Sequence, residues 1–266
     1  MRPDSELALV ACFRDENHYL REWLEYHRLA GVGHVYLYDN DGGAEARAIT
    51  LPFEQSGFVT HHAWQPRSSW LYGRLQHQAH AHCIRHYAGR SAWLMKIDID
   101  EFLAPVGTDD VAAALARYDP GLVRGLRVPR YNFGAAGHET RPEGLVIASY
   151  LRREAGFSNH KDIASTRHLA ANRFTQSSHY WHYRPLSYTR RYVREPDVAG
   201  LRLHHYYTKS FEEYMARQNP AAGRARTRAA FNAHNALRHE VFDDSLLRFA
   251  AALQVRLSPG DARGAA

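Results

Sequence analysis

The sequence has few cysteines and no long apolar run. Its 266 residues include two cysteines, Cys12 and Cys83, too few for the disulfide scaffold of a small secreted domain. No second Cys or His stands at metal-ligand spacing from Cys12, so both thiols are expected to be reduced and buried. No apolar stretch approaches the roughly 20 residues that span a bilayer. Export and integral membrane insertion are therefore not expected, and the predicted location is cytoplasmic.

Glycine is absent from the first predicted strand-to-helix turn, which reads CFRDEN at residues 12–17. A dinucleotide-binding turn of the GxGxxG type and a P-loop both need glycine where the backbone approaches phosphate. The absence argues against both classes, and with them against an ordinary dehydrogenase.

Carboxylates are absent from residues 217–238, a segment that contains five arginines. These are Arg217, Arg224, Arg226, Arg228 and Arg238. Nucleic acid, an anionic membrane surface or a phosphorylated substrate could use such a segment, and a solvated helix face is an equal alternative. Nucleic acid is the least favoured partner, because interleaved aromatic residues and a recognised binding motif are lacking. We expect peripheral docking on an anionic membrane, on its inner face.

The first half of the chain alternates short apolar runs with segments of helical period, which is typical of a largely parallel α/β sheet. We predict strands at 7–13, 34–38, 58–64 and 93–99, a helix from Asn17 as N-cap to the glycines at 31 and 33, and a helix at 75–87. The second half is less regular. It predicts strands at 125–128, 145–151 and 200–207 and helices at 111–118, 211–217 and 246–253.

Polar residues follow three predicted strands at their carboxyl ends, where open α/β sheets bind ligands. The first strand runs into Arg14, the second into Asp39, and the central strand into DIDE at residues 98–101. Two apart on a strand, Asp98 and Asp100 are expected to project from one face. Like charges this close repel unless a cation lies between them, and Mg²⁺ or Mn²⁺ accepts such oxygen ligands. The pair predicts a divalent-cation site, with an acidic strand end in water as the alternative.

Four blocks of sequence occur in one order over roughly residues 8–220. They read RDENHYLREWLEYHRLAGVGHVYLYDND, WLMKIDIDEFL, YNFGAAGH and LRLHHYYTKSFEEY. Together they resemble glycosyltransferase family 92 and the related bacterial family-2-like glycosyltransferases of the domain-of-unknown-function-23 group. The resemblance implies a GT-A fold, a Rossmann-like mixed α/β sheet flanked by helices. It also implies metal-dependent, inverting transfer of a sugar from a nucleotide-diphosphate donor, usually a UDP-sugar, to a glycan or lipid-linked acceptor.

The resemblance implies roles for individual residues. Asp98 and Asp100 match the DxD motif that holds the cofactor, Mn²⁺ or Mg²⁺. His205 matches a histidine that completes the metal shell, and its neighbour His204 stands where relatives commonly carry Asn. Because alternate residues of a strand face opposite ways, only one of the two histidines is expected to face the site. Asp39 matches a position that contacts the nucleotide base or ribose, with an Asx-turn as the alternative.

Three cations are candidate ligands of the donor. Lys209, just after the last predicted strand, and Lys161, ahead of an apolar run, are candidates for the diphosphate, with a solvated lysine as an equal alternative for each. Arg14 is a candidate nucleotide contact, or else a partner of Asp15 or Glu16.

An inverting transfer needs a carboxylate that deprotonates the acceptor hydroxyl. Glu139, in the glycine-bearing loop GAAGHET, is the predicted catalytic base, with Glu101 and Asp162 as alternatives. We expect one domain over residues 1–257, with a nucleotide-binding half at 1–107, an acceptor-side half at 108–257 and a disordered tail at 258–266. A catalytically inactive nucleotide-sugar-binding protein of the same fold is the alternative function.

Overall fold

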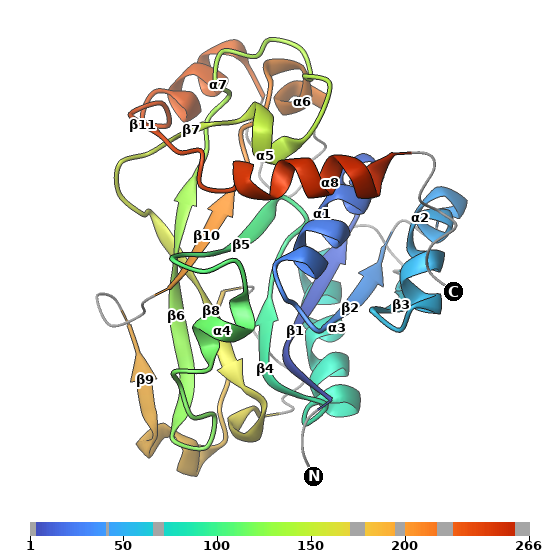
Figure 1. Ribbon diagram of the computed structural model, residues 1–266, viewed down its shortest axis with the longest axis vertical. Helices are drawn as coiled ribbons and strands as arrows, with labels where there is room; N and C mark the ends of the chain where they lie inside the picture. The colour runs from blue at the N-terminus through green and yellow to red at the C-terminus, as the bar shows by residue number, and fades with distance from the viewer. Residues whose placement is uncertain are drawn as a thin grey trace.

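A single mixed sheet forms the centre of the protein. The computed structural model describes residues 4–40, 43–65, 72–170, 179–194, 200–216 and 226–258. Within these residues nine strands pair in the order β3-β2-β1-β4-β8-β6-β10-β5, with β9 beside β6 (Figure 1). The strands are β1 (Ser5–Phe13), β2 (His34–Asp39), β3 (Val59–Ala63), β4 (Ser91–Lys96), β5 (Glu101–Pro105), β6 (Val123–Asn132), β8 (Asn159–Ser165), β9 (Arg191–Val193) and β10 (Leu201–His205). A two-stranded ribbon joins β7 (Arg152–Arg153) to β11 (Val241–Phe242).

Strand direction divides the sheet. The pairs from β3 to β4 are parallel, whereas β8 runs antiparallel to both β4 and β6, and β10 runs antiparallel to β5. The predicted α/β fold with a mixed sheet and flanking helices is therefore confirmed, and the sheet is less parallel than the first half of the sequence predicts.

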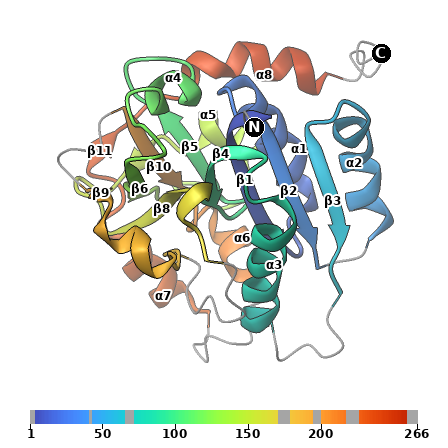
Figure 2. The same cartoon turned by 90° about the horizontal axis from the view of Figure 1, so that it is seen from below.

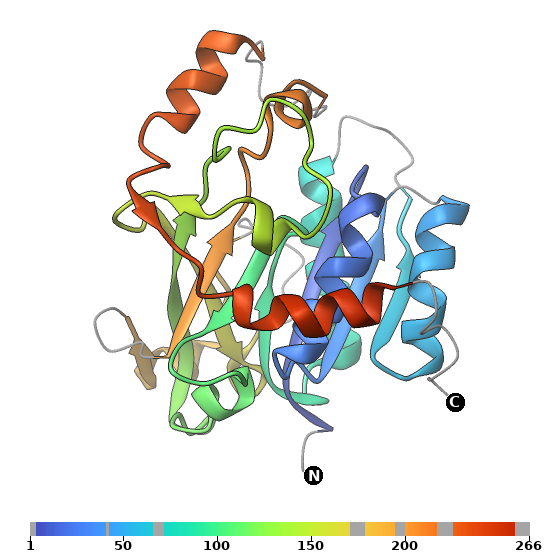
Figure 3. The ribbon, with the colours of Figure 1, turned by 45° about the horizontal axis from the view of Figure 1, so that its top comes forward.

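Helices cover both faces of the sheet. One face carries α1 (Asn17–Leu29), α2 (Ala44–Gln55), α4 (Val111–Leu115) and α8 (Ala250–Leu257), which follows a short 3-10 turn (Leu247–Phe249); α3 (Tyr72–Tyr87) covers the other face (Figure 2). Beyond the ends of β6 and β10 lie α5 (Val146–Ser149), α6 (Phe211–Ala216) and α7 (Arg228–Asn235) (Figure 3). No described helix is long and apolar enough to cross a membrane.

The unbroken apolar run of β1 follows from this layering. Leu7, Leu9 and Phe13 pack into the core under α1, whereas Ala8 and Val10 pack under α3. A strand buried on both faces has no polar side to alternate with, which is the usual pattern in a covered parallel sheet.

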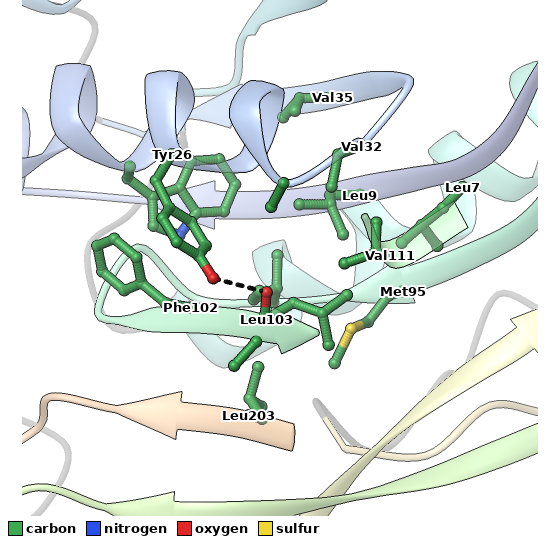
Figure 4. Packing of buried hydrophobic residues seen from close by; sticks show 14 of the residues in the cluster. Leu7, Leu9, Tyr26, Val32, Val35, Met95, Phe102, Leu103, Val111 and Leu203 are labelled. Carbon is green, nitrogen blue, oxygen red and sulfur yellow. Dashed lines mark hydrogen bonds between the residues drawn. The ribbon is translucent and has the colours of Figure 1, made fainter. Parts of the chain in front are cut away.

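Helix α1 also holds the strand that follows the acidic residues. Trp23 Nε1 donates to the carbonyl of Glu101 at 2.8 Å. The Tyr26 hydroxyl donates to the carbonyl of Leu103 at 3.0 Å (Figure 4). All four side chains are buried. These bonds attach β5, the strand that follows the turn, to α1.

Some local predictions are wrong. The segment 145–151 contains α5 in place of the predicted strand, because the buried carboxylate of Glu22 accepts from Val146 N at 2.9 Å and Ile147 N at 3.3 Å and caps the first turn. The N-cap of α1 is Glu16, and Asn17 donates its side-chain amide to Glu45 instead. Helix α4 ends at Leu115, three residues before the predicted end. Seven of the described helices and strands are not predicted at all: α2, α7, β5, β7, β8, β9 and β11.

Candidate functional site

The acidic residues predicted to bind a cation lie in the turn that joins β4 to β5. Because β4 ends at Lys96, Asp98 and Asp100 do not project from one face of a strand, and that prediction is wrong. Glu101 N donates to the carbonyl of Asp98 at 3.0 Å, and Asp98 N donates to the carboxylate of Glu101 at 3.0 Å. Tyr206 N donates to the carbonyl of Asp100 at 2.8 Å. The turn is thereby joined to the end of β10, and its two aspartates have different surroundings.

Asp98 is held by an internal cation. Lys161 Nζ lies 2.6 Å from Asp98 Oδ2 and also contacts the Glu101 carboxylate, while Gln76 Nε2 of α3 donates to Asp98 Oδ1 at 3.2 Å. Arg130 reaches Glu101 at 3.3 Å. Burial lowers the pKa of Lys161, but the charges of Asp98 and Glu101 outweigh burial and leave that pKa above its ordinary value. Lys161 is thus a protonated partner of two carboxylates, and its predicted contact with phosphate stays a prediction.

Asp100 faces a histidine at the end of β10. Asp100 Oδ1 and His205 Nε2 are 3.5 Å apart, and both side chains are buried. The other ring nitrogen, Nδ1, lies 2.7 Å from Asn132 Oδ1. His204 faces the opposite side, where its ring packs 4.7 Å from the Phe133 ring and burial lowers its pKa to about 4. Of the two adjacent histidines, His205 is the one beside the acidic turn.

The distance between Asp100 and His205 suits two ligands of one ion. Ligand oxygen and nitrogen atoms lie about 2.0 to 2.2 Å from a small divalent ion, so two that share an ion are about 3 to 3.5 Å apart. Among the described residues, no group of three or more His, Cys, Asp and Glu side chains is arranged to hold a metal ion. Asp100 and His205 are therefore a candidate pair of ligands, in the same turn as Asp98. Mg²⁺ is commonly bound by only one or two protein carboxylates, because substrate phosphates and water supply its other ligands.

Asp39 lies at the same edge of the sheet. It ends β2, is buried, and its Oδ2 lies 3.2 Å from His61 Nε2 of β3. Burial raises the pKa of Cys12 to about 12, and the negative charges of Asp98 and Asp39 add to this. Both carboxylates are therefore close to the end of β1. The carboxyl ends of three neighbouring strands bring Asp39 and the acidic turn to one region, as predicted from strand order.

The two other predicted cations also have protein partners. Arg14 Nε lies 3.3 Å from the Asp15 carboxylate, so it has one of the two acidic partners that the sequence offers as an alternative to a nucleotide contact. Lys209 is buried with its Nζ 3.2 Å from the centre of the Tyr19 ring, a cation–π contact, and has a backbone φ of 50°. Left-handed backbone is uncommon for lysine, so packing holds Lys209 in this conformation. Nucleotide contacts by either residue stay predictions.

Glu139, the predicted base, is exposed. Its two carboxylate oxygens accept from Arg228 at 2.7 Å each, and its carbonyl accepts from Glu212 N of α6 at 2.9 Å. The hydrogen bonds from Arg228 hold the pKa of Glu139 below its ordinary value. The two alternative candidates for the base, Glu101 and Asp162, are both buried. Asp162 Oδ1 lies 3.3 Å from Arg127 Nε. The assignment of Glu139 as the catalytic base stays a prediction.

The arginines of the basic segment are largely used within the protein. Arg226 donates to the Tyr214 carbonyl at 2.9 Å and Arg238 donates to Thr208 Oγ1 at 2.9 Å, in addition to the Arg228–Glu139 pair. Arg217, Arg224 and the tail from residue 259 lie outside the described residues.

Residues around the site that the sequence does not predict include Gln76 on Asp98, His61 on Asp39 and Asn132 on His205. Each is far from its partner along the chain, so no local spacing joins them. Asn132 alone stands in one of the four family-like blocks, YNFGAAGH, which is a signal that could have identified it.

Comparison with known proteins gives one consistent result. The family model described as glycosyltransferase family 92 matches residues 10–237. A family 92 protein of Ricinus communis is 27% identical over 79% of this chain and 36% of its own length. One of Oryza sativa subsp. japonica is 28% identical over 61% of this chain and 27% of its own length. The chain thus spans about a third of the length of these relatives.

Similarity to solved structures is partial. The S. aureus TarS 1–349 crystal structure is 12% identical, with a TM-score of 0.39 over 60% of this chain and 47% of that one. The WbbM bifunctional glycosyltransferase is 14% identical, with a TM-score of 0.32 over 48% of this chain and 24% of that one.

Proposed function

The chain belongs to glycosyltransferase family 92, and on that premise we propose that it transfers a sugar from a UDP-sugar to a glycan or lipid-linked acceptor, with inversion, using a divalent cation. The observation that carries this proposal is the pair formed by Asp100 and His205, with 3.5 Å between Oδ1 and Nε2. Asp100 shares its turn with Asp98, which lies with Asp39 near the end of β1.

Asp100 and His205 are the proposed ligands of Mn²⁺ or Mg²⁺, and Asp98, two residues earlier in the same turn, is the third member of the predicted set. A carboxylate and an imidazole are chemically suited to Mn²⁺ and leave positions open for phosphate oxygens. When bound, the cation would offset the negative charge that develops on the departing nucleoside diphosphate.

The remaining residues bind the substrates. Asp39 is the proposed acceptor of a hydrogen bond from the nucleotide base or ribose, supported by its burial at the end of β2. Lys209 is a proposed partner of the diphosphate. Glu139 is the proposed base, which takes the proton from the acceptor hydroxyl while that oxygen attacks the anomeric carbon opposite the leaving group. A cytoplasmic location and docking on an anionic membrane stay predictions.

The test is a panel of nucleotide sugars assayed for donor hydrolysis and for transfer. We expect activity with one or more UDP-sugars in Mn²⁺, loss of that activity in EDTA, and recovery when Mn²⁺ is restored. Asp98→Ala and Asp100→Ala should each lose activity, whereas Asp4→Ala, at the exposed start of the chain described, should keep it. Full activity in EDTA would refute metal dependence. UDP binding without hydrolysis or transfer would support the inactive binding protein instead.

A further inference from the structure

Asn132 lies beside His205, the histidine that faces the acidic turn. Asn132 is the last residue of β6 and pairs with His205 in the parallel register of β6 and β10. This register places the two side chains together, with His205 Nδ1 2.7 Å from Asn132 Oδ1. Phe133 N donates to the His205 carbonyl at 2.9 Å, which fixes the backbone beside this contact.

The Asn132 amide lies between Ser158 and His205. Its Nδ2 donates to the hydroxyl oxygen of Ser158, and its Oδ1 faces His205 Nδ1. The backbone is fixed too, since Asn132 N donates to Glu154 Oε1 at 2.7 Å and Glu154 N donates to the Asn132 carbonyl at 3.1 Å. The Asn132 side chain is buried, whereas its partner Ser158 is exposed.

An amide oxygen only accepts hydrogen bonds, so this contact requires that His205 carry a proton on Nδ1. In the neutral imidazole the lone pair then lies on Nε2, the nitrogen 3.5 Å from Asp100 Oδ1. In that tautomer Nε2 and the Asp100 carboxylate both present lone pairs, which a shared cation can bind. The other tautomer would place its proton on Nε2, where it would bond to Asp100 and occupy the position of the ion.

We propose that Asn132 is a positioning residue that selects the Nδ1–H tautomer of His205, so that Nε2 binds the divalent cation. This inference rests on the proposed function. Metal-binding histidines commonly donate their second N–H to a protein oxygen, and removal of that oxygen weakens metal binding by about 10- to 100-fold. Because imidazole suits transition ions better than Mg²⁺, Asn132 also raises the preference of the site for Mn²⁺ over Mg²⁺.

The first measurement is calorimetric titration of the full chain with MnCl₂ and with MgCl₂. Asn132→Leu should weaken Mn²⁺ binding by about 10- to 100-fold and Mg²⁺ binding less, so the preference for Mn²⁺ falls. Asn132→Asp should keep Mn²⁺ binding, since a carboxylate also accepts the Nδ1–H bond. Asn159→Ala is the matched control on β8, because the described bond of its side chain is to the neighbouring His160 N.

The second measurement reads the tautomer without metal, from the ¹⁵N shifts of the His205 ring. The wild type and Asn132→Asp should show the proton on Nδ1, and Asn132→Leu should show both tautomers. Ser158→Ala, at an exposed position, should give an intermediate change and serves if Asn132→Leu fails to fold.

Different results would refute the proposed metal dependence and the proposed role of Asn132. If the wild type binds no Mn²⁺, the proposed metal dependence fails. If the wild type binds Mn²⁺, Asp100→Ala abolishes binding and Asn132→Leu binds as the wild type does, the role of Asn132 is overturned while the proposed function stands. A His205 proton found on Nε2 in the metal-free wild type also overturns it.

Discussion

Replacement of Lys161 by methionine separates a structural role for this lysine from the predicted phosphate contact. The Lys161 side chain is 1% exposed and neutralises two carboxylates, Asp98 at 2.6 Å and Glu101. Methionine is similar in length and apolar, so it fills the same space without the charge. The variant therefore leaves Glu101, which is fully buried, without its nearest cation.

The loss of stability depends on which hydrogen bonds and charged partners each carboxylate keeps in the variant. Asp98 is 35% exposed, so water solvates it and its share of the loss is about 1 kcal/mol or less. Glu101 keeps Arg130 at 3.3 Å and the Asp98 N–H at 3.0 Å. Removal of one partner of a buried ion pair destabilises a protein by about 3 to 5 kcal/mol. Because Glu101 keeps these two bonds, we place Lys161→Met at the lower end of that range. We expect a loss of about 3 kcal/mol.

Urea unfolding followed by tryptophan fluorescence measures this loss. With a denaturant slope of about 3 kcal/mol/M, the midpoint should fall by about 1 M. The double variant Lys161→Met with Glu101→Gln should recover at least about 1 kcal/mol, because the uncompensated charge is then gone. Arg85→Met, which removes an exposed cation of α3, is the control and should leave the midpoint unchanged. A wild-type midpoint for Lys161→Met, together with weaker UDP binding, would refute the structural role and support the phosphate contact.

Two further predictions concern single carboxylates. Burial raises the pKa of Glu22 from 4.5 to about 7, so the folded state binds the proton more tightly than the unfolded state. The free energy of unfolding should therefore fall by up to about 3 kcal/mol as the pH rises from 4.5 to 7. Glu22→Gln should flatten this pH dependence in urea titrations, and a pH profile parallel to that of the wild type contradicts the prediction. Glu139→Gln should keep UDP binding but slow transfer by about 10²- to 10⁴-fold, whereas an unchanged transfer rate removes Glu139 from candidacy.

Much of the architecture follows from the sequence alone. The apolar run of β1 predicts a strand and the helical period after it predicts α1, because these patterns are local and the core enforces them. The polar residues at strand ends predict the edge of the sheet where Asp39 and the acidic turn lie. The four sequence blocks predict the family, which the family model confirms.

Local signals failed where a distant residue decides the conformation. Residues 145–151 have the apolar character of a strand, but Glu22, more than a hundred positions away, supplies the acceptors that cap a helix there. Similarly, β4 stops at Lys96, so spacing of two along the chain does not set the directions of Asp98 and Asp100.

The alternation rule predicts that only one of His204 and His205 faces the site, but not which one. The choice depends on how β10 is registered between β5 and β6, a property of the assembled sheet. Likewise, the sequence identifies Asp98 and Asp100 as a pair, whereas the tertiary structure separates them, with Lys161 beside Asp98 and His205 beside Asp100. The sequence determined which residue types reach this edge of the sheet, because strand and helix patterns are local. Only the tertiary structure decided their partners, because each partner comes from another strand or helix whose register the local sequence does not contain.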